Sequence, residues 1–164
     1  MFNSLESITI DQTRNKIIFI DLDGTLAPYR FNGHVGDPNG TSCGMSDEEI
    51  EMGIFLMRKP SRHMQNVINT SLAKEYVIIS NCHAKKEIED KNKWLDKYYP
   101  TIEKRLYPQE SESKADIIIK YCQEHNYKLD DVLYVDDIIE YLREAEKKGI
   151  ESWHISSFLD WNYQ

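Results

Sequence analysis

Residues 16–26 read Lys-Ile-Ile-Phe-Ile-Asp-Leu-Asp-Gly-Thr-Leu, the most informative segment of the chain for its fold. Its first five residues form a nearly continuous β-branched and aromatic run. Such a run predicts a strand that is buried on both faces, which is the pattern of a central strand in a parallel sheet. Asp21 begins at the carboxyl end of this strand, and Asp23 follows two residues later. The same stretch therefore predicts a parallel sheet and an acidic group at one of its edges.

Outward from this strand, apolar runs and amphipathic stretches alternate along the chain. Strands are predicted at residues 76–79, 104–107, 132–135 and 152–155, and helices at 46–57, 61–74, 84–98, 112–125 and 138–148. The first fifteen residues are expected to form a short arm or an edge strand. Strands that alternate with helices predict an α/β fold with a Rossmann-like, doubly wound parallel sheet covered on both faces.

The segment of residues 27–60 interrupts this alternation. Glycines and prolines in its first half predict a long loop, and long loops of this kind are usually functional. Ser46 and Glu49 form a capping-box pattern that opens a helix, and Pro60 closes the segment. The segment is too short for a helical-bundle cap, so we expect a small cap insertion within a single domain of residues 1–164. Such a cap leaves the site open or lets a partner subunit complete it.

The composition limits the choice of partner. With 164 residues and 19.3 kDa, the chain is expected to form one compact domain with its own core. A formal net charge of −8 and a pI near 5.1 disfavour a nucleic acid polymer, which needs clustered Lys and Arg. An acidic surface also repels phosphate esters, so a phosphate site in this chain needs a cation and a few basic residues close by.

The cysteines and the hydropathy indicate the compartment. Cys43, Cys82 and Cys122 have neither a C-x-x-C pair nor zinc-ligand spacing, so they are predicted to be free thiols. With no secretory leader at the N-terminus, we expect a reducing, cytoplasmic environment. No apolar run approaches the ~18 residues that span a membrane, so no membrane association is expected. The sequence leaves the oligomeric state open.

Four acids lie where two of the predicted strands end. Asp21 and Asp23 follow the first strand, and Asp136 and Asp137 follow the strand at 132–135. In a doubly wound sheet, ligands bind beyond the carboxyl ends of the strands. Either acidic pair alone could form a turn or cap a helix. Two pairs that converge on one edge would repel each other, and the simplest relief is a divalent cation. Hard oxygen ligands suit magnesium, so the sequence predicts a Mg²⁺ site.

Residues 21–26, Asp-Leu-Asp-Gly-Thr-Leu, resemble the first motif of the haloacid dehalogenase-like (HAD) hydrolases, D-x-D-G-T/V-L/T after a buried strand. Ser80, at the end of a predicted strand, is similar to the hydroxyl residue of the family's second motif. Lys114 is similar to the lysine of the third motif, and residues 132–137 resemble the fourth motif in its Asp-Asp variant. The resemblance spans residues 16 to about 155, which is nearly the whole chain.

The resemblance implies the chemistry of a phosphohydrolase. Asp21 would attack phosphorus and form an aspartyl-phosphate, while Asp23 would protonate the leaving oxygen and then activate water. Ser80 would hydrogen-bond the phosphoryl oxygens, and Lys114 would offset their charge and hold the nucleophile. The implied magnesium ligands are Asp21, the backbone carbonyl of Asp23, Asp137, and Asp136 as a ligand or as a residue that orients the ligands.

Simpler interpretations stand beside these roles. Ser80 could N-cap the next helix, and Lys114 could be a solvated residue in a first helical turn, although a lysine there opposes the helix dipole. The family's fourth motif commonly has a second acid four residues after the metal-binding Asp, where this chain has Tyr141. Four cations near the predicted cap are candidates for substrate contact, but solvated surface explains each of them more simply: Arg30, Arg58, Lys59 and Arg62.

Residues 91–95, Lys-Asn-Lys-Trp-Leu, look like the K-x-x-W-L segment of the 5'(3')-deoxyribonucleotidase-like branch, and Val135-Asp136-Asp137 agrees with that branch. Trp94 is otherwise explained as part of the core stripe of an amphipathic helix. The leading prediction is a magnesium-dependent phosphatase of a small phosphomonoester, with a nucleoside monophosphate as one candidate substrate.

Two alternatives to a phosphatase remain open. One is a phosphotransferase or phosphomutase of the same superfamily, which usually needs a larger cap to exclude water. The other is a regulatory module that binds phosphate or metal without turnover. A response-regulator receiver domain is excluded by the order of its residues, because in this chain Lys114 precedes the second acidic pair.

Overall fold

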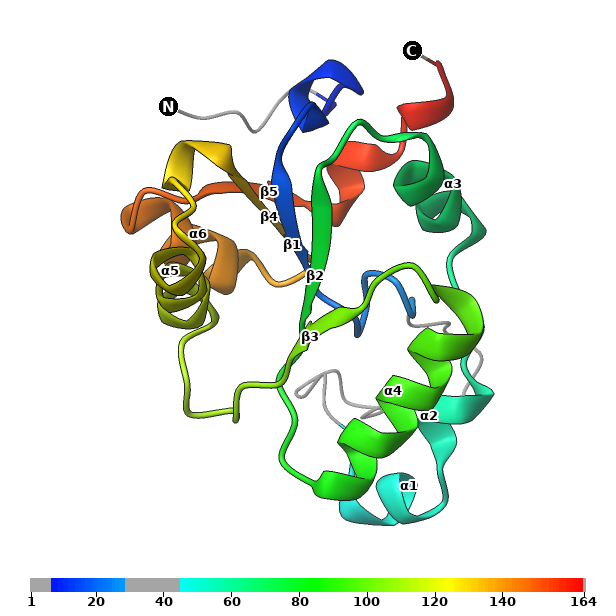
Figure 1. The fold of residues 1–164 in the computed structure, drawn as a ribbon. Helices are drawn as coiled ribbons and strands as arrows, with labels where there is room; N and C mark the ends of the chain where they lie inside the picture. Colours follow the sequence, from blue (N-terminus) through cyan, green and yellow to red (C-terminus); the bar gives the residue numbers. More distant parts are fainter. Residues whose placement is uncertain (1–6, 29–44, 164) are drawn as a thin grey trace.

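The computed structural model describes residues 7–28 and 45–163, and these form a parallel five-stranded sheet with helices on both faces (Figure 1). The strand order is β3-β2-β1-β4-β5, and every neighbouring pair is parallel. The predicted doubly wound α/β fold is therefore confirmed, and so is the central place of the first strand. The strands are β1 (Ile17–Ile20), β2 (Glu75–Ile79), β3 (Lys104–Leu106), β4 (Val132–Asp136) and β5 (Glu151–His154).

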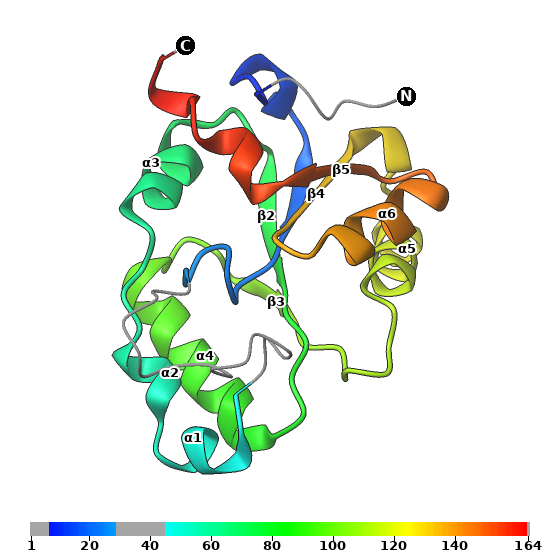
Figure 2. The same cartoon turned by 180° about the vertical axis from the view of Figure 1, so that it is seen from behind.

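The helices divide between the two faces of the sheet, as the opposite views in Figures 1 and 2 show. Helices α3 and α4 lie on one side, and α5 and α6 lie on the other. The α-helices are α1 (Asp47–Glu51), α2 (Ile54–Met57), α3 (Arg62–Thr70), α4 (Lys85–Tyr98), α5 (Lys114–His125) and α6 (Ile139–Lys147). Short 3₁₀ turns lie at Asp11–Thr13, Leu129–Asp131, Ile155–Phe158 and Trp161–Tyr163.

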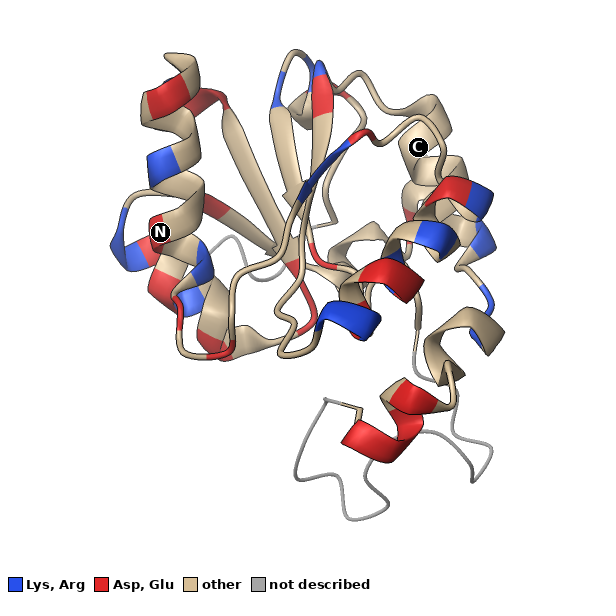
Figure 3. Cartoon of the chain, turned by 60° about the horizontal axis from the view of Figure 1, so that its bottom comes forward, with Lys and Arg blue, Asp and Glu red and all other residues tan. Residues whose placement is uncertain are grey.

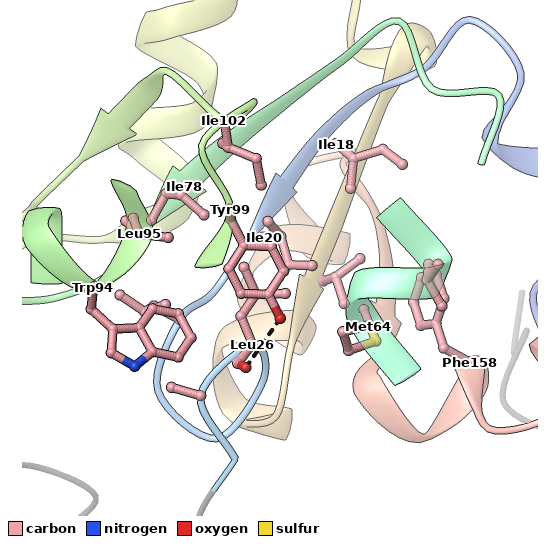
Figure 4. Close-up of a cluster of buried hydrophobic side chains, with 14 of the residues drawn as sticks. Ile18, Ile20, Leu26, Met64, Ile78, Trp94, Leu95, Tyr99, Ile102 and Phe158 are labelled. Carbon is pink, nitrogen blue, oxygen red and sulfur yellow. Dashed lines mark hydrogen bonds between the residues drawn. The ribbon is translucent and has the colours of Figure 1, made fainter. Parts of the chain in front are cut away.

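Strand β1 shows why the sheet needs both layers, because all four of its residues are buried. Successive side chains of a strand point to opposite faces. Ile18 and Ile20 accordingly join a core with α3 and α4, which Figure 4 shows in close-up. Ile17 and Phe19 join a second core with α5 and α6. The continuous apolar run in the sequence is thus explained by burial on both faces.

Several predicted boundaries are wrong for local reasons. The helix predicted at 46–57 begins with the expected capping box at Ser46, but it breaks into α1 and α2 at Gly53, whose φ is +66°. That left-handed backbone cannot continue a helix. Helix α3 ends before Ser71 rather than at residue 74. Ser113 is the N-cap of α5, so this helix begins at Lys114, two residues after the predicted start at 112.

The structure tests the prediction for the N-terminal arm, but only part of the prediction for the cap loop. Among the described residues before β1 there is no strand but a 3₁₀ turn at Asp11–Thr13, so the edge-strand alternative is wrong for residues 7–15. Most of the loop predicted between residues 27 and 41 lies outside the described residues. Helices α1 and α2 pack beside α4 (Figures 1 and 2), while the predicted cap at 27–60 stays a prediction.

Strands β1 and β2 run downward in Figure 1, so their carboxyl ends point toward the side of the molecule that Figure 3 brings forward. Acidic α1, which begins with Asp47, Glu48 and Glu49, lies beyond these strand ends, at the bottom of Figure 1. The chain leaves β1 toward β2 on one side, whereas β4 pairs with β1 on the other. Strands β1 and β4 therefore flank the point where the winding of the sheet reverses, which is where such folds bind ligands.

Candidate active site

The backbone of the sheet fixes three of the predicted site residues. The N–H of Asp21 donates to the carbonyl of Val135 at 2.9 Å, so Asp21 extends the β1–β4 ladder by one residue. The N–H of Ser80 donates to the carbonyl of Leu106 at 3.1 Å and extends the β2–β3 ladder in the same way. Asp136 is the last residue of β4. All three side chains therefore lie at the carboxyl edge of the sheet, as predicted.

Lys114 comes from the first turn of α5 and reaches into this edge. Its side chain is only 4% exposed, and its Nζ contacts Asp21 Oδ1 at 2.6 Å and Asp136 Oδ2 at 2.8 Å. The ammonium also lies 5.0 Å from the centre of the Tyr141 ring. Lys114 is thus a buried bridge between β1 and β4, and the solvated interpretation is wrong. Tyr141 stands at the position where a second acid is common, and its ring faces this lysine.

Asp136 and Asp137 differ in the hydrogen bonds that the protein makes to them. Asp136 is fully buried, and its Oδ2 accepts from Lys114 and from the hydroxyl of Tyr134. Its Oδ1 accepts from the N–H of Ile138 at 2.9 Å. Asp137 is half-buried, and its backbone carbonyl contacts the ring of His154 at 3.1 Å. The carboxylate of Asp136 is therefore held by the protein on both oxygens.

Asp21, Asp136 and Asp137 form a group that fits a divalent cation. Each offers a carboxylate oxygen, and these oxygens all lie within 4.8 Å of one another. Three carboxylates face one lysine, which leaves a formal charge of −2 when all are ionised. Burial raises the pKa of Asp21 well above its usual range, although Lys114 opposes this shift. Burial and the neighbouring Asp136 raise the pKa of Asp137 to about 6. The group thus lacks positive charge, and a hard divalent cation would supply it.

Asp23 lies in a different environment, surrounded by donors. Its Oδ1 contacts Arg58 at 2.6 Å, and its Oδ2 contacts Lys91 at 2.7 Å and the hydroxyl of Ser80 at 3.1 Å. Burial alone would raise the pKa of Asp23, but Lys91 and Arg58 together lower it below its usual value. The backbone carbonyl of Asp23 as a metal ligand stays a prediction.

Lys91 is a site residue to which sequence reasoning gave no role. It is 1% exposed, and its ammonium also contacts Glu87 at 2.7 Å, Ser80 at 3.0 Å and the carbonyl of Asn81 at 3.1 Å. A signal was present in the sequence. Lys91 shares the buried face of α4 with Trp94 and Leu95, three and four residues later, where a lysine needs a partner.

Arg58 is the second residue whose role was missed. Solvated surface was its simpler interpretation, but its side chain is only 6% exposed and it pairs with Asp23. It directly follows the four-residue helix α2, and no sequence pattern marks it. Lys59 and Arg62 are exposed, in agreement with that interpretation, and Arg30 lies outside the described residues.

Two further sequence interpretations are settled by the structure. Ser80 does not cap α4, because Ala84 holds that position and the Ser80 hydroxyl faces Asp23 and Lys91. Cys82 and Cys122 are free, as predicted, and the structure buries both of them, while Cys43 lies outside the described residues. Among the described helices, none is both long and apolar enough to cross a membrane.

The fold is similar to that of solved HAD-like phosphatases. A haloacid dehalogenase-like family hydrolase from Streptococcus pneumoniae matches with a TM-score of 0.54 and 15% identity, over 91% of this chain and 90% of that one. The N-terminal part of a Bacteroides fragilis protein, which contains a phosphatase domain complexed with Mg, matches with a TM-score of 0.53 and 18% identity. That match covers 94% of this chain and 41% of the other.

A 3-deoxy-D-manno-octulosonate 8-phosphate phosphatase from Moraxella catarrhalis, in complex with magnesium and phosphate ions, matches with a TM-score of 0.45 and 14% identity. The match covers 82% of this chain and 65% of that one, so this chain spans less than two thirds of two of the three structures. No protein-family model matches the chain, and no curated protein matches its sequence. At these identities the similarities establish the fold, which is that of the HAD-like hydrolases.

Proposed function

We propose that this protein belongs to the HAD superfamily and is a magnesium-dependent phosphatase of a small phosphomonoester. The observation that carries the proposal is the buried group of Asp21, Asp136 and Asp137, bridged by Lys114 and placed beside Asp23. A structural ion-pair cluster would be balanced in charge, whereas this one has an excess of carboxylates at the edge where doubly wound sheets bind ligands.

The metal ligands follow from this geometry. Asp21 and Asp137 would hold Mg²⁺ through their carboxylates, together with the backbone carbonyl of Asp23. Asp136 has donors on both oxygens, which favours its orienting role, with its remaining lone pairs available to the ion. When bound, Mg²⁺ would offset the repulsion between an anionic nucleophile and an anionic phosphoryl group.

The nucleophile in this mechanism is Asp21. One of its carboxylate oxygens attacks phosphorus, the bond from phosphorus to the leaving oxygen breaks, and an aspartyl-phosphate forms. Lys114 holds the attacking carboxylate and offsets the charge of the phosphoryl oxygens. The Ser80 hydroxyl, on the neighbouring strand end, donates to one of those oxygens. Lys91 contacts the Ser80 hydroxyl at 3.0 Å and adds a second positive charge on this side.

Asp23 serves both halves of the reaction. Because Lys91 and Arg58 lower its pKa, Asp23 rests as a carboxylate and first takes a proton, which the monoanion of the substrate's phosphate group can supply. It gives this proton to the leaving oxygen as the aspartyl-phosphate forms, and it becomes a carboxylate again. That carboxylate then takes a proton from the water that attacks phosphorus, which releases phosphate and restores Asp21. The carboxylate of Asp23 is held by Lys91 and Arg58 and is not grouped with the other three acids, which argues against this carboxylate as a metal ligand. Its carboxylate form, which those cations stabilise, is the one that takes the proton from water in the second half of the reaction.

The experiment is an assay with p-nitrophenyl phosphate and a panel of nucleoside monophosphates, with Mg²⁺ or with a chelator. We expect turnover that needs Mg²⁺ and that falls by about 10⁴-fold or more in Asp21→Asn. Asp131→Asn, an exposed acid just before β4, is the matched control and should keep full activity. Turnover that survives Asp21→Asn or the chelator would contradict the mechanism.

The same assay separates the alternatives. Preference for nucleoside monophosphates over other small esters would support the deoxyribonucleotidase-like assignment suggested by residues 91–95. Transfer of the phosphoryl group to an added alcohol, rather than to water, would favour a phosphotransferase. Binding of a phosphate analogue without any turnover would favour a regulatory module.

A further inference from the structure

The two oxygens of Asp23 are held by different parts of the chain. Oδ2 contacts Lys91 at 2.7 Å and Ser80 at 3.1 Å. Ser80 directly follows β2, whereas Lys91 comes from α4 and its ammonium reaches the same strand end, where it also contacts the carbonyl of Asn81 at 3.1 Å. Oδ1 contacts Arg58 at 2.6 Å, which comes from the residue that follows α2. The carboxylate therefore has one side toward the strand end and one side toward the α2 segment.

Arg58 is fixed at both its backbone and its side chain. Its carbonyl accepts from the indole N–H of Trp94 at 2.9 Å, and its N–H donates to the carbonyl of Phe55 at 3.1 Å. Its guanidinium lies 5.0 Å from the centre of the Phe55 ring, and that ring meets Trp94 edge to face at 5.6 Å. A long side chain held at both ends loses little further entropy when it orients a partner.

The two oxygens of Asp23 would have different roles: Oδ2 exchanges the proton, and Oδ1 is held by Arg58. Ser80 is the residue expected to bind a phosphoryl oxygen, so the Oδ2 side of Asp23 faces the phosphoryl group and the leaving oxygen. A substrate that takes over the hydrogen bond of Ser80 leaves Oδ2 with Lys91 as its partner and with a second lone pair for the proton that it passes to the leaving oxygen. Arg58 stays on Oδ1 and keeps the carboxyl plane aimed.

We propose that Arg58 is a positioning residue that holds the Oδ1 of Asp23 so that Oδ2 points at the leaving oxygen. The proposal rests on the proposed function, because it needs Asp23 to act as the proton donor. It gives the α2 segment a part in the reaction, since the Phe55–Trp94 contact that docks α2 on α4 also sets the position of Arg58.

A merely structural role for Arg58 makes a different prediction. If Arg58 only joins α2 to the rest of the protein, its loss weakens the whole site, and all substrates suffer alike. If it aims the proton donor, its loss penalises only those esters whose leaving oxygen must be protonated. Aryl phosphates of the same shape but different leaving-group basicity separate the two cases.

The experiment measures kcat/KM for phenyl, 4-nitrophenyl and 2,4-dinitrophenyl phosphate in the wild type, Arg58→Gln and Arg58→Lys. For Arg58→Gln we expect a loss of about 10²-fold with phenyl phosphate and of less than about threefold with the dinitrophenyl ester. Arg58→Lys keeps a donor and should recover part of the loss with phenyl phosphate. Lys59→Gln removes an exposed charge from the next residue and should leave all three rates unchanged.

Each result decides the matter. An equal loss with all three esters, or no loss with phenyl phosphate, would overturn the positioning role and leave the proposed function intact. A wild type that hydrolyses none of the esters, or an Asp21→Asn variant that still does, would overturn the proposed function and the positioning role together. If Arg58→Gln does not fold, as judged by circular dichroism, Arg58→Lys decides by the same dependence on leaving group.

Discussion

The two halves of the site differ in their charge balance. The β1–β4 half contains Asp21, Asp136 and Asp137 against the single cation Lys114, a formal charge of −2. The α2–α4 half contains Asp23 and Glu87 against Lys91 and Arg58, and it is neutral by itself.

The pKa values reflect this difference. In the β1–β4 half, burial raises the pKa of Asp21 and of Asp137. In the α2–α4 half, Lys91 and Arg58 overcome the effect of burial and lower the pKa of Asp23. A buried group that lacks countercharge needs an ion from outside, while a balanced one orients its members with the protein's own side chains. The first half is therefore suited to hold a cation, and the second holds the Asp23 carboxylate in a fixed orientation.

The largest expected effect comes from removing one buried lysine from each half. Lys91→Met leaves two buried carboxylates with one fewer partner and should lower the free energy of unfolding by about 3–5 kcal/mol, with or without Mg²⁺. Lys114→Met should have a similar cost without Mg²⁺ but a smaller cost at saturating Mg²⁺, because the ion compensates the same carboxylates. Urea denaturation of each variant, with and without Mg²⁺, measures these free energies of unfolding.

Lys85→Met, at an exposed lysine on the same helix whose partner Glu89 is itself exposed, is the matched control and should change stability little. A loss in Lys91→Met that Mg²⁺ largely restores would contradict the division into two halves.

The next effect is the stabilisation by magnesium itself. An ion that binds only the folded state adds about 2.7 kcal/mol when its free concentration is about 100 times its dissociation constant, so the Tm should rise. Asp137→Asn removes a carboxylate from the β1–β4 half and should abolish most of this rise. Glu87→Gln makes the same chemical change in the α2–α4 half and should leave the rise intact even if the starting Tm is lower. Thermal denaturation of the two variants with and without Mg²⁺ tests this prediction. An equal Tm rise in both would contradict magnesium binding in the β1–β4 half.

The raised pKa of Asp137 predicts a pH dependence. Magnesium binds the carboxylate, so below pH 6 its affinity should fall by up to about tenfold per pH unit from this group. Without added metal, the folded state keeps the Asp137 proton up to about pH 6, whereas the unfolded chain loses it near 3.8. The protonated Asp137 therefore makes its whole contribution to the free energy of unfolding below about pH 3.8. That contribution is lost as the pH rises through about 6.

Calorimetric titration of Mg²⁺ between pH 5 and 8 follows the affinity, and Asp137→Asn is the control that removes this group. A magnesium affinity that does not change between pH 5 and 7 would show that the carboxyl ionises at its ordinary value.

The smallest effect concerns the support of the α2–α4 half. Gly53→Ala places a side chain at a φ of +66° and should cost about 1–2 kcal/mol of stability. Because Gly53 lies between α1 and α2, the change should leave the Tm rise caused by Mg²⁺ untouched. Met52→Ala, at the exposed neighbouring residue, is the control. Thermal denaturation measures the Tm of both variants with and without Mg²⁺. A smaller Tm rise in Gly53→Ala would show that the two halves are coupled.

Much of the fold and half of the site could be predicted because their signals are local. The run at residues 16–20 is apolar at every position, which fits a strand covered on both faces, and β1 is central. Ser46 showed its capping box in four residues, and the structure has it. The break at Gly53 was missed because a glycine within a helical pattern does not reveal its φ.

The sequence could not show that Arg58 and Lys114 are buried. Arg58 was interpreted as solvated surface, which is wrong, and Lys114 was left open between a solvated and a functional role. A cation in the sequence looks the same whether it is solvated or paired, and only burial distinguishes the two. Arg58 and Asp23 are 35 residues apart, and their contact depends on how α2 packs on α4. Lys91 could have been found, because a lysine on the apolar face of a helix must be paired, but its partner could not.

The sequence is enough to predict that acids gather at one edge of a parallel sheet, because the carboxyl ends of parallel strands share an edge. The apolar run at residues 16–20 therefore indicates where Asp21 and Asp23 lie. That these two acids belong to different halves of the site depends on tertiary packing. Asp21 faces the carboxylates of Asp136 and Asp137 at the end of β4, while Asp23 faces one cation that follows α2 and one from α4. The environment of a carboxylate is set by side chains distant in sequence, and packing alone brings them together.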